Sequence, residues 1–167
     1  YKSTSSHLCG LVTDGSILCR GYDAYGEASP PSGTFVAISG GQYHRCGIDS
    51  TGSISCWGNN SGDPNDMNQV SGAPTSGSFL ALSAGLNHNC AIDSLGTIHC
   101  WGDNSNGQSS PPSGTLSQIS SGGDTAVGHS CGLDSAGSIH CWGNNDYGQV
   151  SDMPSGVFTQ ISAGKNH

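Results

Sequence analysis

Eight cysteines are the residues of this chain with the clearest capacity for chemistry, and they form four pairs of identical spacing. Nine residues separate the two members of every pair. The pairs are Cys9 and Cys19, Cys46 and Cys56, Cys90 and Cys100, and Cys131 and Cys141. An even number of evenly spaced cysteines is typical of a disulfide framework, and no cysteine is left over as a free nucleophile.

Histidines recur in step with the cysteines, two positions before each pair, at His7, His44, His88 and His129, and His167 opens a fifth register. Imidazoles from several copies could surround an axis and bind a metal. Ligands from separate repeats would have to converge within metal-bond distance, and no carboxylate second shell accompanies them. We therefore expect these histidines to bridge backbone groups of neighbouring repeats and to bind no metal.

Tryptophan follows the second cysteine in three copies, at Trp57, Trp101 and Trp142, and Arg20 takes its place in the first. Indole planes could stack on sugars, which keeps a lectin as an alternative. Because the position repeats, we expect burial between sheets. Turn residues that bond nearby backbone are expected three positions further on. They are Asn60, Asn104 and Asn145, with Asp23 in the first copy.

The second copy departs from the pattern, because SGDPNDMNQVSGAPTSG replaces the Gly-Gln element of the others. Its Asp63, Asn65 and Asp66 supply oxygen ligands that suit Ca²⁺, but an EF-hand pattern is absent, so we expect a solvated acidic loop. Asn59 begins an Asn-Asn-Ser glycosylation sequence. The third copy lengthens its glycine turn to SSGGDTAVGH. Such departures are where individual function is expected.

Catalysis finds no support in the residues. No nucleophile with a base, asymmetric pair of carboxylates or phosphate-binding loop is evident, and no cofactor is implied. His99 and His140 precede the second cysteine of their pairs, where Leu18 and Ser55 stand in other copies. A position that accepts Leu, Ser and His is a surface or inter-repeat position.

The composition excludes several partners. The formal charge is −8 with only four Lys and Arg residues, so no basic patch favours nucleic acid or an anionic membrane. No run of 18 apolar residues predicts a membrane-spanning helix. The start lacks an initiator Met and a signal-peptide stretch, from which we expect a mature or excerpted chain.

Stepping along the histidines divides residues 1–167 into four repeats of about 40 residues within a single expected domain. The repeats cover 7–43, 44–87, 88–128 and 129–166. Each contains a motif such as HRCGIDSTGSISCWG, in which two short strands flank a three-residue turn ending in glycine. Units of this length cannot bury an apolar face alone, so a stacked all-β array is expected.

Counting outward from the turn places the two cysteines of a repeat opposite each other. If Asp49 and Ser53 close the hairpin, Cys46 faces Cys56 at a non-hydrogen-bonded pair, where side chains are closest. Such a bridge removes about 3 kcal/mol of unfolded-state entropy and indicates an oxidising compartment. The alternative is a cytosolic protein in which the cysteines are buried thiols.

The order of these elements resembles the repeat of the regulator-of-chromosome-condensation type of β-propeller. The His-x-Cys strand, glycine turn, Cys-Trp-Gly, Asn and Gly-Gln elements and segments such as ISAG occur in sequence over nearly the whole chain. The resemblance implies propeller blades, seven in a family ring, and the paired cysteines are similar to those of secreted or surface variants. This chain lacks the basic tail of the founding family member. We therefore do not expect it to share that protein's nucleotide exchange or chromatin binding.

Four copies fall short of seven, and segments 1–6 and 161–166 copy the same strand. We therefore expect part of a longer array. A four-blade ring closed by FTQISAG on the first blade, or a ring of two chains, is the alternative. We expect a non-catalytic extracellular or cell-surface module that binds a protein or self-assembles. A lectin with a glycan ligand and a secreted enzyme inhibitor or regulator are the alternative functions.

Overall fold

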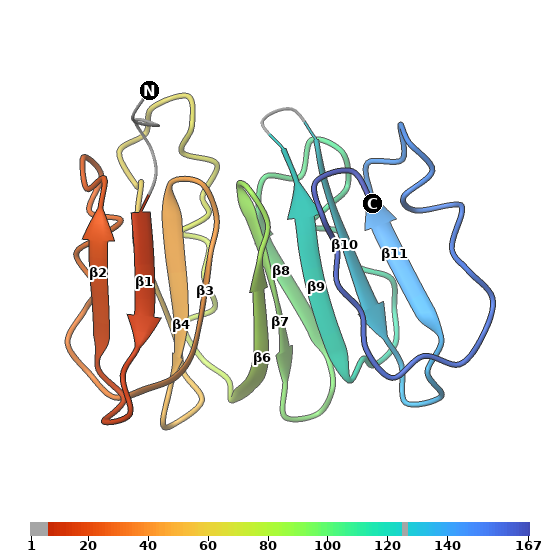
Figure 1. The fold of residues 1–167 in the computed structure, drawn as a ribbon, viewed down its shortest axis with the longest axis horizontal. Coiled ribbons are helices and arrows are strands. Elements are labelled where there is room, and N and C mark those ends of the chain that lie inside the picture. The colour runs from red at the N-terminus through yellow and green to blue at the C-terminus, as the bar shows by residue number, and fades with distance from the viewer. Residues whose placement is uncertain (1–6, 125–126) are drawn as a thin grey trace.

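The structure is a computed structural model that describes residues 7–124 and 127–167, and within them the regular elements are all β-strands (Figure 1). The first two sheets use β1 (His7–Leu11) and β2 (Ile17–Gly21), then β3 (Phe35–Gly40), β4 (His44–Asp49) and β5 (Ile54–Gly58). The next uses β6 (Phe79–Ala84), β7 (His88–Asp93) and β8 (Ile98–Gly102), and the last β9 (Gln118–Gly123), β10 (Gly128–Leu133) and β11 (Ile139–Gly143).

Each sheet is one blade of a β-propeller. Three described blades are antiparallel meanders of an inner, a middle and an outer strand, and the first has the middle and outer strands β1 and β2. The middle and outer strands form the hairpin predicted from the repeated motif. Residues 1–6, predicted to copy segment 161–166, lie outside the described residues.

The hairpin turns follow from local chemistry. In the second blade Asp49 N donates to Ser53 O at 2.9 Å, and Asp49 Oδ1 accepts from the amides of Thr51 and Ser53. Gly52 has a φ of 86°, which a residue with a Cβ rarely adopts. This turn fixes the register in which Cys46 pairs with Cys56 and Ile48 with Ile54.

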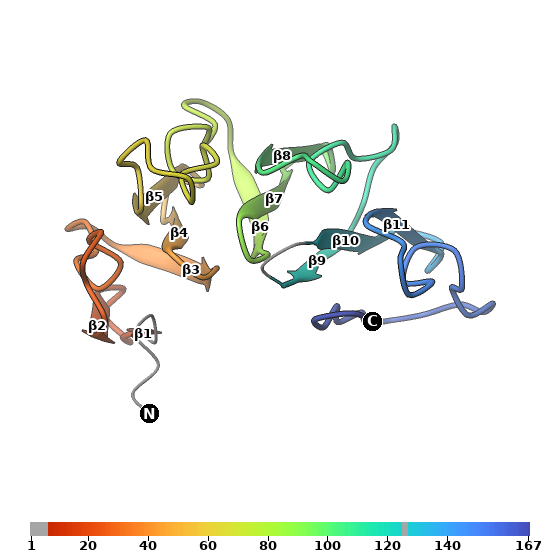
Figure 2. The ribbon, with the colours of Figure 1, turned by 90° about the horizontal axis from the view of Figure 1, so that it is seen from above.

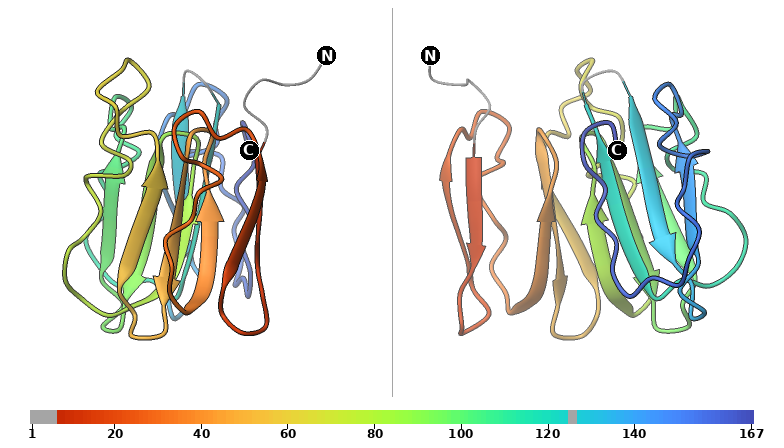
Figure 3. Two further views of the ribbon diagram at one scale, coloured as in Figure 1. Left: turned by 90° about the vertical axis from the view of Figure 1, so that its left-hand side faces the viewer. Right: turned by 45° about the vertical axis from the view of Figure 1, so that its right-hand side comes forward.

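The blades stand upright side by side, and the turns that join middle to outer strands lie at one common end, which we call the lower rim (Figures 1 and 3). The opposite end, the upper rim, carries the turns that leave the inner strands and the loops that follow the outer strands. Apolar side chains between successive blades form the core, in three clusters that each contain one tryptophan.

Seen from above, the blades follow an arc around a central axis, and its two ends do not meet (Figure 2). Segment 159–167 lies beside the fourth blade, where Gly123 N donates to Gly164 O at 3.2 Å and Ala163 N to Ser120 Oγ at 2.8 Å. Among the described residues it forms no ladder with β1 or β2. The structure therefore does not have the four-blade ring closed by FTQISAG, because this segment does not pair with the first blade and the arc stays open (Figure 2).

Candidate functional site

All eight cysteines are joined across their hairpins, in the pairs that the register predicts. The Cα atoms of each pair lie 4.0 to 4.1 Å apart, as at a non-hydrogen-bonded position of an antiparallel ladder. Cys46 and Cys90 are fully buried, so these bridges belong to the core between blades as well as to their own hairpins. No free thiol is present among the described residues.

The tryptophans link each blade to the one before it. Nε1 of Trp57 donates to the carbonyl of Glu27 at 3.1 Å. Nε1 of Trp101 donates to the carbonyl of Gln69 at 3.0 Å, and that of Trp142 to the carbonyl of Gln108 at 2.9 Å. Each indole is only 7% exposed. Burial is as expected, and the sugar-stacking alternative is wrong because no ring face is open to a ligand.

The residues that accept these indole bonds are themselves fixed by a repeated bond. The side chains of Gln69 and Gln108 are buried and accept from the amide two residues earlier, and Glu27 does the same in the first blade. The second copy lacks the Gly-Gln dipeptide but keeps its structural equivalent, which sequence reasoning missed. Asn68, with a φ of 61°, takes the glycine's place, and asparagine tolerates this conformation better than most residues.

The repeat histidines bridge neighbouring blades, but mostly through side chains. His44 Nε2 donates to Asn89 Oδ1 at 2.8 Å, and His88 Nε2 shares a hydrogen bond with Ser130 Oγ at 2.9 Å. Asn89 and Ser130 each directly follow the repeat histidine of the next blade. The predicted backbone bridge is seen at His129, whose Nε2 donates to the carbonyl of His167 at 3.2 Å. At His44 and His88 the hydrogen-bond partner is instead the small polar residue in the next middle strand.

Burial sets the charge state of these imidazoles. His44 and His88 are almost completely inaccessible, and burial lowers the pKa of each to about 4. The bond to Asn89 opposes this effect at His44, and Arg45 adds to it. At the first interface Arg45 donates to the carbonyl of His7 at 2.9 Å. The buried histidines are therefore neutral structural groups at neutral pH.

Most of the predicted turn residues act as turn residues. Asn104 Oδ1 accepts from Ser109 N at 3.0 Å, and Asn145 Oδ1 from Val150 N at 2.9 Å. Asp23 Oδ1 accepts from Ala28 N in the same way in the first blade. The prediction fails for Asn60, which is exposed and makes no side-chain bond within the described chain. The insertion that follows it moves the turn bonds to other residues.

The carboxylates considered as calcium ligands, Asp63 and Asp66, accept hydrogen bonds from backbone amides. Asp63 Oδ1 accepts from Asn65 N at 2.8 Å, and Asp66 Oδ2 from Gly62 N at 2.8 Å. No group of three or more His, Cys, Asp or Glu residues that could hold a metal occurs in residues 7–124 and 127–167.

The possible glycosylation acceptor Asn59 lies inside the fold. Its side chain is fully buried, donates to Asp63 Oδ1 at 2.9 Å and accepts from Ser61 Oγ at 2.8 Å. An attached glycan would have to displace these bonds.

Two Asp–His pairs mark the lower rim. His99 Nε2 lies 3.0 Å from Asp93 Oδ2, and His140 Nε2 lies 3.0 Å from Asp134 Oδ2. Each histidine lowers the pKa of its aspartate. The same aspartates accept the turn amides, so the pairs stabilise hairpins, in keeping with the surface position predicted for both histidines.

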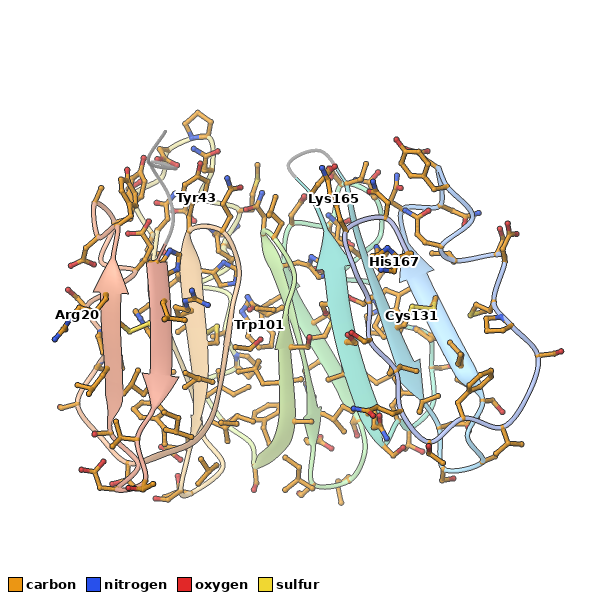
Figure 4. All side chains as sticks on the ribbon, viewed as in Figure 1. Arg20, Tyr43, Trp101, Cys131, Lys165 and His167 are labelled. Atoms are coloured by element: carbon orange, nitrogen blue, oxygen red, sulfur yellow. A yellow bond between two sulfur atoms is a disulfide. The ribbon has the colours of Figure 1, made fainter. Side chains whose placement is uncertain are left out.

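The upper rim surrounds a concavity on the axis. Glycine and alanine at the ends of the inner strands line a cavity of about 550 Å³. Each of the second, third and fourth blades, and segment 159–167, adds one side chain that differs from the others. They are Gln42, Leu86, Asp124 and Lys165. Lys165 Nζ lies 3.2 Å from Asp124 Oδ2, and Figure 4 places Lys165 at the same end as Tyr43.

Three tyrosines gather on this rim beside the first and second blades. Tyr25 meets Tyr22 and Tyr43 edge to face, with ring centroids 6.5 and 6.0 Å apart. A side-chain hydrogen bond with Asp63, together with its negative charge, raises the pKa of Tyr25. Sequence reasoning missed this cluster, because Tyr25 and Asp63 come from different repeats and meet only when the blades stack.

No helix in the described residues is long and apolar enough to cross a membrane.

Four disulfide-closed hairpins, stacked through Trp and His bonds, define the chain as a set of β-propeller blades. Residues 79–108 and 117–149 match the model of the regulator of chromosome condensation (RCC1) repeat. The chain carries repeats of the RCC1 type.

Solved structures share this fold. The ectodomain of the Physcomitrella patens receptor kinase CR4 is 31% identical, with a TM-score of 0.77, over 99% of this chain and 47% of that one. The CRINKLY WD40 ectodomain of the Arabidopsis thaliana receptor kinase ACR4 is 25% identical, with a TM-score of 0.60, over 83% and 52%.

Yeast RCC1 (Prp20), in a crystal structure with Kap60, is 16% identical with a TM-score of 0.73, over 96% of this chain and 51% of that one, and shows the fold alone. The chain thus spans about half the length of these structures. No curated protein matches the sequence.

Proposed function

We propose that this chain is a non-catalytic, protein-binding part of an extracellular propeller and that the upper rim is its binding surface. The observation that carries this proposal is the concavity on the axis, where a repeated frame of small residues presents a different side chain from the second, third and fourth blades and from segment 159–167. Repeated positions elsewhere bond within or between blades. Side chains that differ between repeats, held on a backbone that is the same in each repeat, are suited to selecting a binding partner.

The chemistry of the rim suits a protein. Tyr22, Tyr25 and Tyr43 supply a rigid aromatic group with polar tips, which is typical of residues that dominate protein interfaces. Leu86 adds an apolar side chain, and the Lys165–Asp124 pair adds both charges around it. Such a surface offers apolar contact at its centre and polar contact at its edge.

An extracellular location is supported by two independent features. All eight cysteines are paired, and disulfides persist in oxidising compartments. The similar structures at 31% and 25% identity are receptor kinase ectodomains. Non-reducing mass spectrometry of protein from its natural source tests the location, because the secreted form must lack eight thiol hydrogens. A fully reduced mass in freshly isolated protein would contradict it.

Site-specific photo-crosslinking tests the binding surface. A photoreactive residue at Leu86 on the upper rim is compared with one at Leu95, which is 80% exposed at the tip of a lower-rim turn. We expect a discrete crosslinked protein from position 86 and none from position 95. A chain labelled at Gln42, also on the upper rim, is expected to give the same crosslinked protein and to lose it when Tyr43→Ala and Leu86→Asp are combined. Crosslinks of equal yield from both rims, or from the lower rim only, would refute the assignment.

A further inference from the structure

A cavity of about 420 Å³ opens at the free side of the fourth blade. It lies between the hairpin of β10 and β11, the loop that follows β11, and segment 159–167. Apolar groups line it, among them Cys131, Cys141, Ile139 and Ile161, and Gln149 borders it. Of the residues that line it, only Ala163 also lines the concavity on the axis, and the inference drawn from this cavity does not depend on the proposed function.

The same set of groups surrounds a tryptophan at each filled interface. Around Trp57 they are the disulfide of the preceding blade, an isoleucine of its outer strand and an aliphatic residue of the next inner strand. In the first interface these are Cys9–Cys19, Ile17 and Ile38. Around Trp101 they are Cys46–Cys56, Ile54 and Leu82, and around Trp142 they are Cys90–Cys100, Ile98 and Ile119.

The cavity repeats this set for a fourth time. The Cys131–Cys141 disulfide, Ile139 and Ile161 stand at the corresponding positions. The hydrogen-bond acceptor is also prepared. Tyr147 N donates to Gln149 Oε1 at 2.9 Å, as Asn106 N does to Gln108 Oε1 at 2.8 Å, and the carbonyl of Gln108 receives the indole of Trp142. The carbonyl of Gln149 therefore corresponds to that acceptor.

Segment 159–167 holds the position of an inner strand beside this cavity. A serine ladder joins successive inner strands, from Ala84 N to Ser39 Oγ at 2.9 Å and from Ser121 N to Ser83 Oγ at 2.9 Å. The bond from Ala163 N to Ser120 Oγ at 2.8 Å continues the ladder. Yet no described strand pairs with this segment. An inner strand without a middle strand is open to strand addition.

We propose that this cavity and segment 159–167 together form a docking site for a disulfide-closed, tryptophan-bearing hairpin of the same repeat type. The middle strand of the hairpin pairs with segment 159–167. Its indole enters between Ile139 and Ile161 and donates to the carbonyl of Gln149. The site therefore completes a further blade by the interface that the chain already uses three times.

The free first blade of a second copy does not meet these requirements. Arg20 stands where the indole is needed, and Figure 4 shows it pointing away from the other blades. Leu8, 74% exposed, stands where Asn89 and Ser130 bond the histidine of the preceding blade. Docking of that blade would leave the Gln149 carbonyl without the indole donor.

Fluorine NMR on the full oxidised chain tests the site. The probe is a synthetic peptide of residues 88–103 with its disulfide closed and 5-fluorotryptophan at position 101, which gives one signal free of the native tryptophans. We expect a saturable shift with one site per chain. A peptide with Trp101→Leu is expected to bind about tenfold or more weakly, because it lacks both the ring and the donor.

Variants of the chain locate the binding. Ile139→Glu and, separately, Ile161→Glu are expected to abolish the saturable shift, whereas Val157→Glu, at an 82% exposed position outside the cavity lining, leaves it unchanged. Near-ultraviolet circular dichroism and the intact oxidised mass verify that each variant is folded. The proposal would be overturned if the Leu peptide bound with equal affinity or if both glutamate variants retained binding. It would also be overturned if the shift did not saturate, or if self-association of the chain blocked the peptide.

Discussion

At the scale of single residues, the buried imidazoles of His44 and His88 tie folding to pH. Each is neutral in the folded chain, with a pKa of about 4 against an ordinary value of 6.5. The unfolded chain therefore binds more protons than the folded chain between these values, so stability is complete above pH 6.5 and falls as the pH drops toward 4. Each histidine contributes up to roughly 3 kcal/mol to this loss.

Urea unfolding at pH 7.5 and pH 4.5 measures the effect. His44→Gln, in which the amide nitrogen replaces Nε2 as donor to Asn89, is expected to lower stability at pH 7.5 but to reduce the difference between the two pH values. Leu95→Gln serves as the control, because Leu95 is 80% exposed and carries no titratable group. An unchanged pH dependence in His44→Gln would show that the buried imidazole does not carry it.

Asn68 shows how one residue preserves a blade despite an insertion. The φ of 61° at Asn68 places Gln69 so that the Gln69 carbonyl accepts the hydrogen bond from Trp101 Nε1. Asn68→Gly is expected to leave stability within about 0.5 kcal/mol, whereas Asn68→Val is expected to cost about 1 to 2 kcal/mol, because a branched Cβ is strained at positive φ. Urea unfolding midpoints of the two variants check this, and equal midpoints would contradict it.

At the scale of elements, the hairpin is the part that sequence alone defines. Turn glycines, alternating apolar residues and cysteine spacing are local, so counting from Gly52 correctly placed Cys46 opposite Cys56. The partners of His44 and Tyr25 could not be found in this way. Asn89 and Asp63 lie about a repeat away, and only the stacking of blades decides which side chain offers the nearest acceptor.

The cross-strand disulfide stabilises each hairpin through the unfolded chain. Replacing both Cys46 and Cys56 by Ala removes a bridge with a sequence separation of 10 and is expected to lower the free energy of unfolding by about 3 kcal/mol. The matched variant removes Cys9 and Cys19 at the terminal blade, where Cys9 is only half-buried. Both are measured by urea unfolding.

Both bridges pack in a cluster with a tryptophan, but the loss in the second blade should be the larger because Cys46 is fully buried whereas Cys9 is only half-buried. Equal losses would mean that loop entropy acts alone. A loss well below 1 kcal/mol in both variants would contradict the stabilising role of the bridges.

At the scale of the whole molecule, stability should vary along the arc. In a stacked array each repeat gains most of its stability from interfaces with its neighbours. The second and third blades are packed on both sides, whereas the first described blade, β1 and β2, packs on one side only and exposes Leu8 and Leu18 at 74% and 62%. The first blade should therefore open locally before the others do.

Hydrogen exchange measured by mass spectrometry tests this gradient. Amides of β7 in the third blade are expected to exchange at a rate close to that of global unfolding, and those of β1 much faster, although both hairpins carry the same disulfide. Binding of the tryptophan hairpin should slow exchange in β10 and β11 and leave β1 unchanged, because nearest-neighbour coupling weakens with each interface. Uniform protection along the chain would instead show that the blades unfold as one cooperative unit.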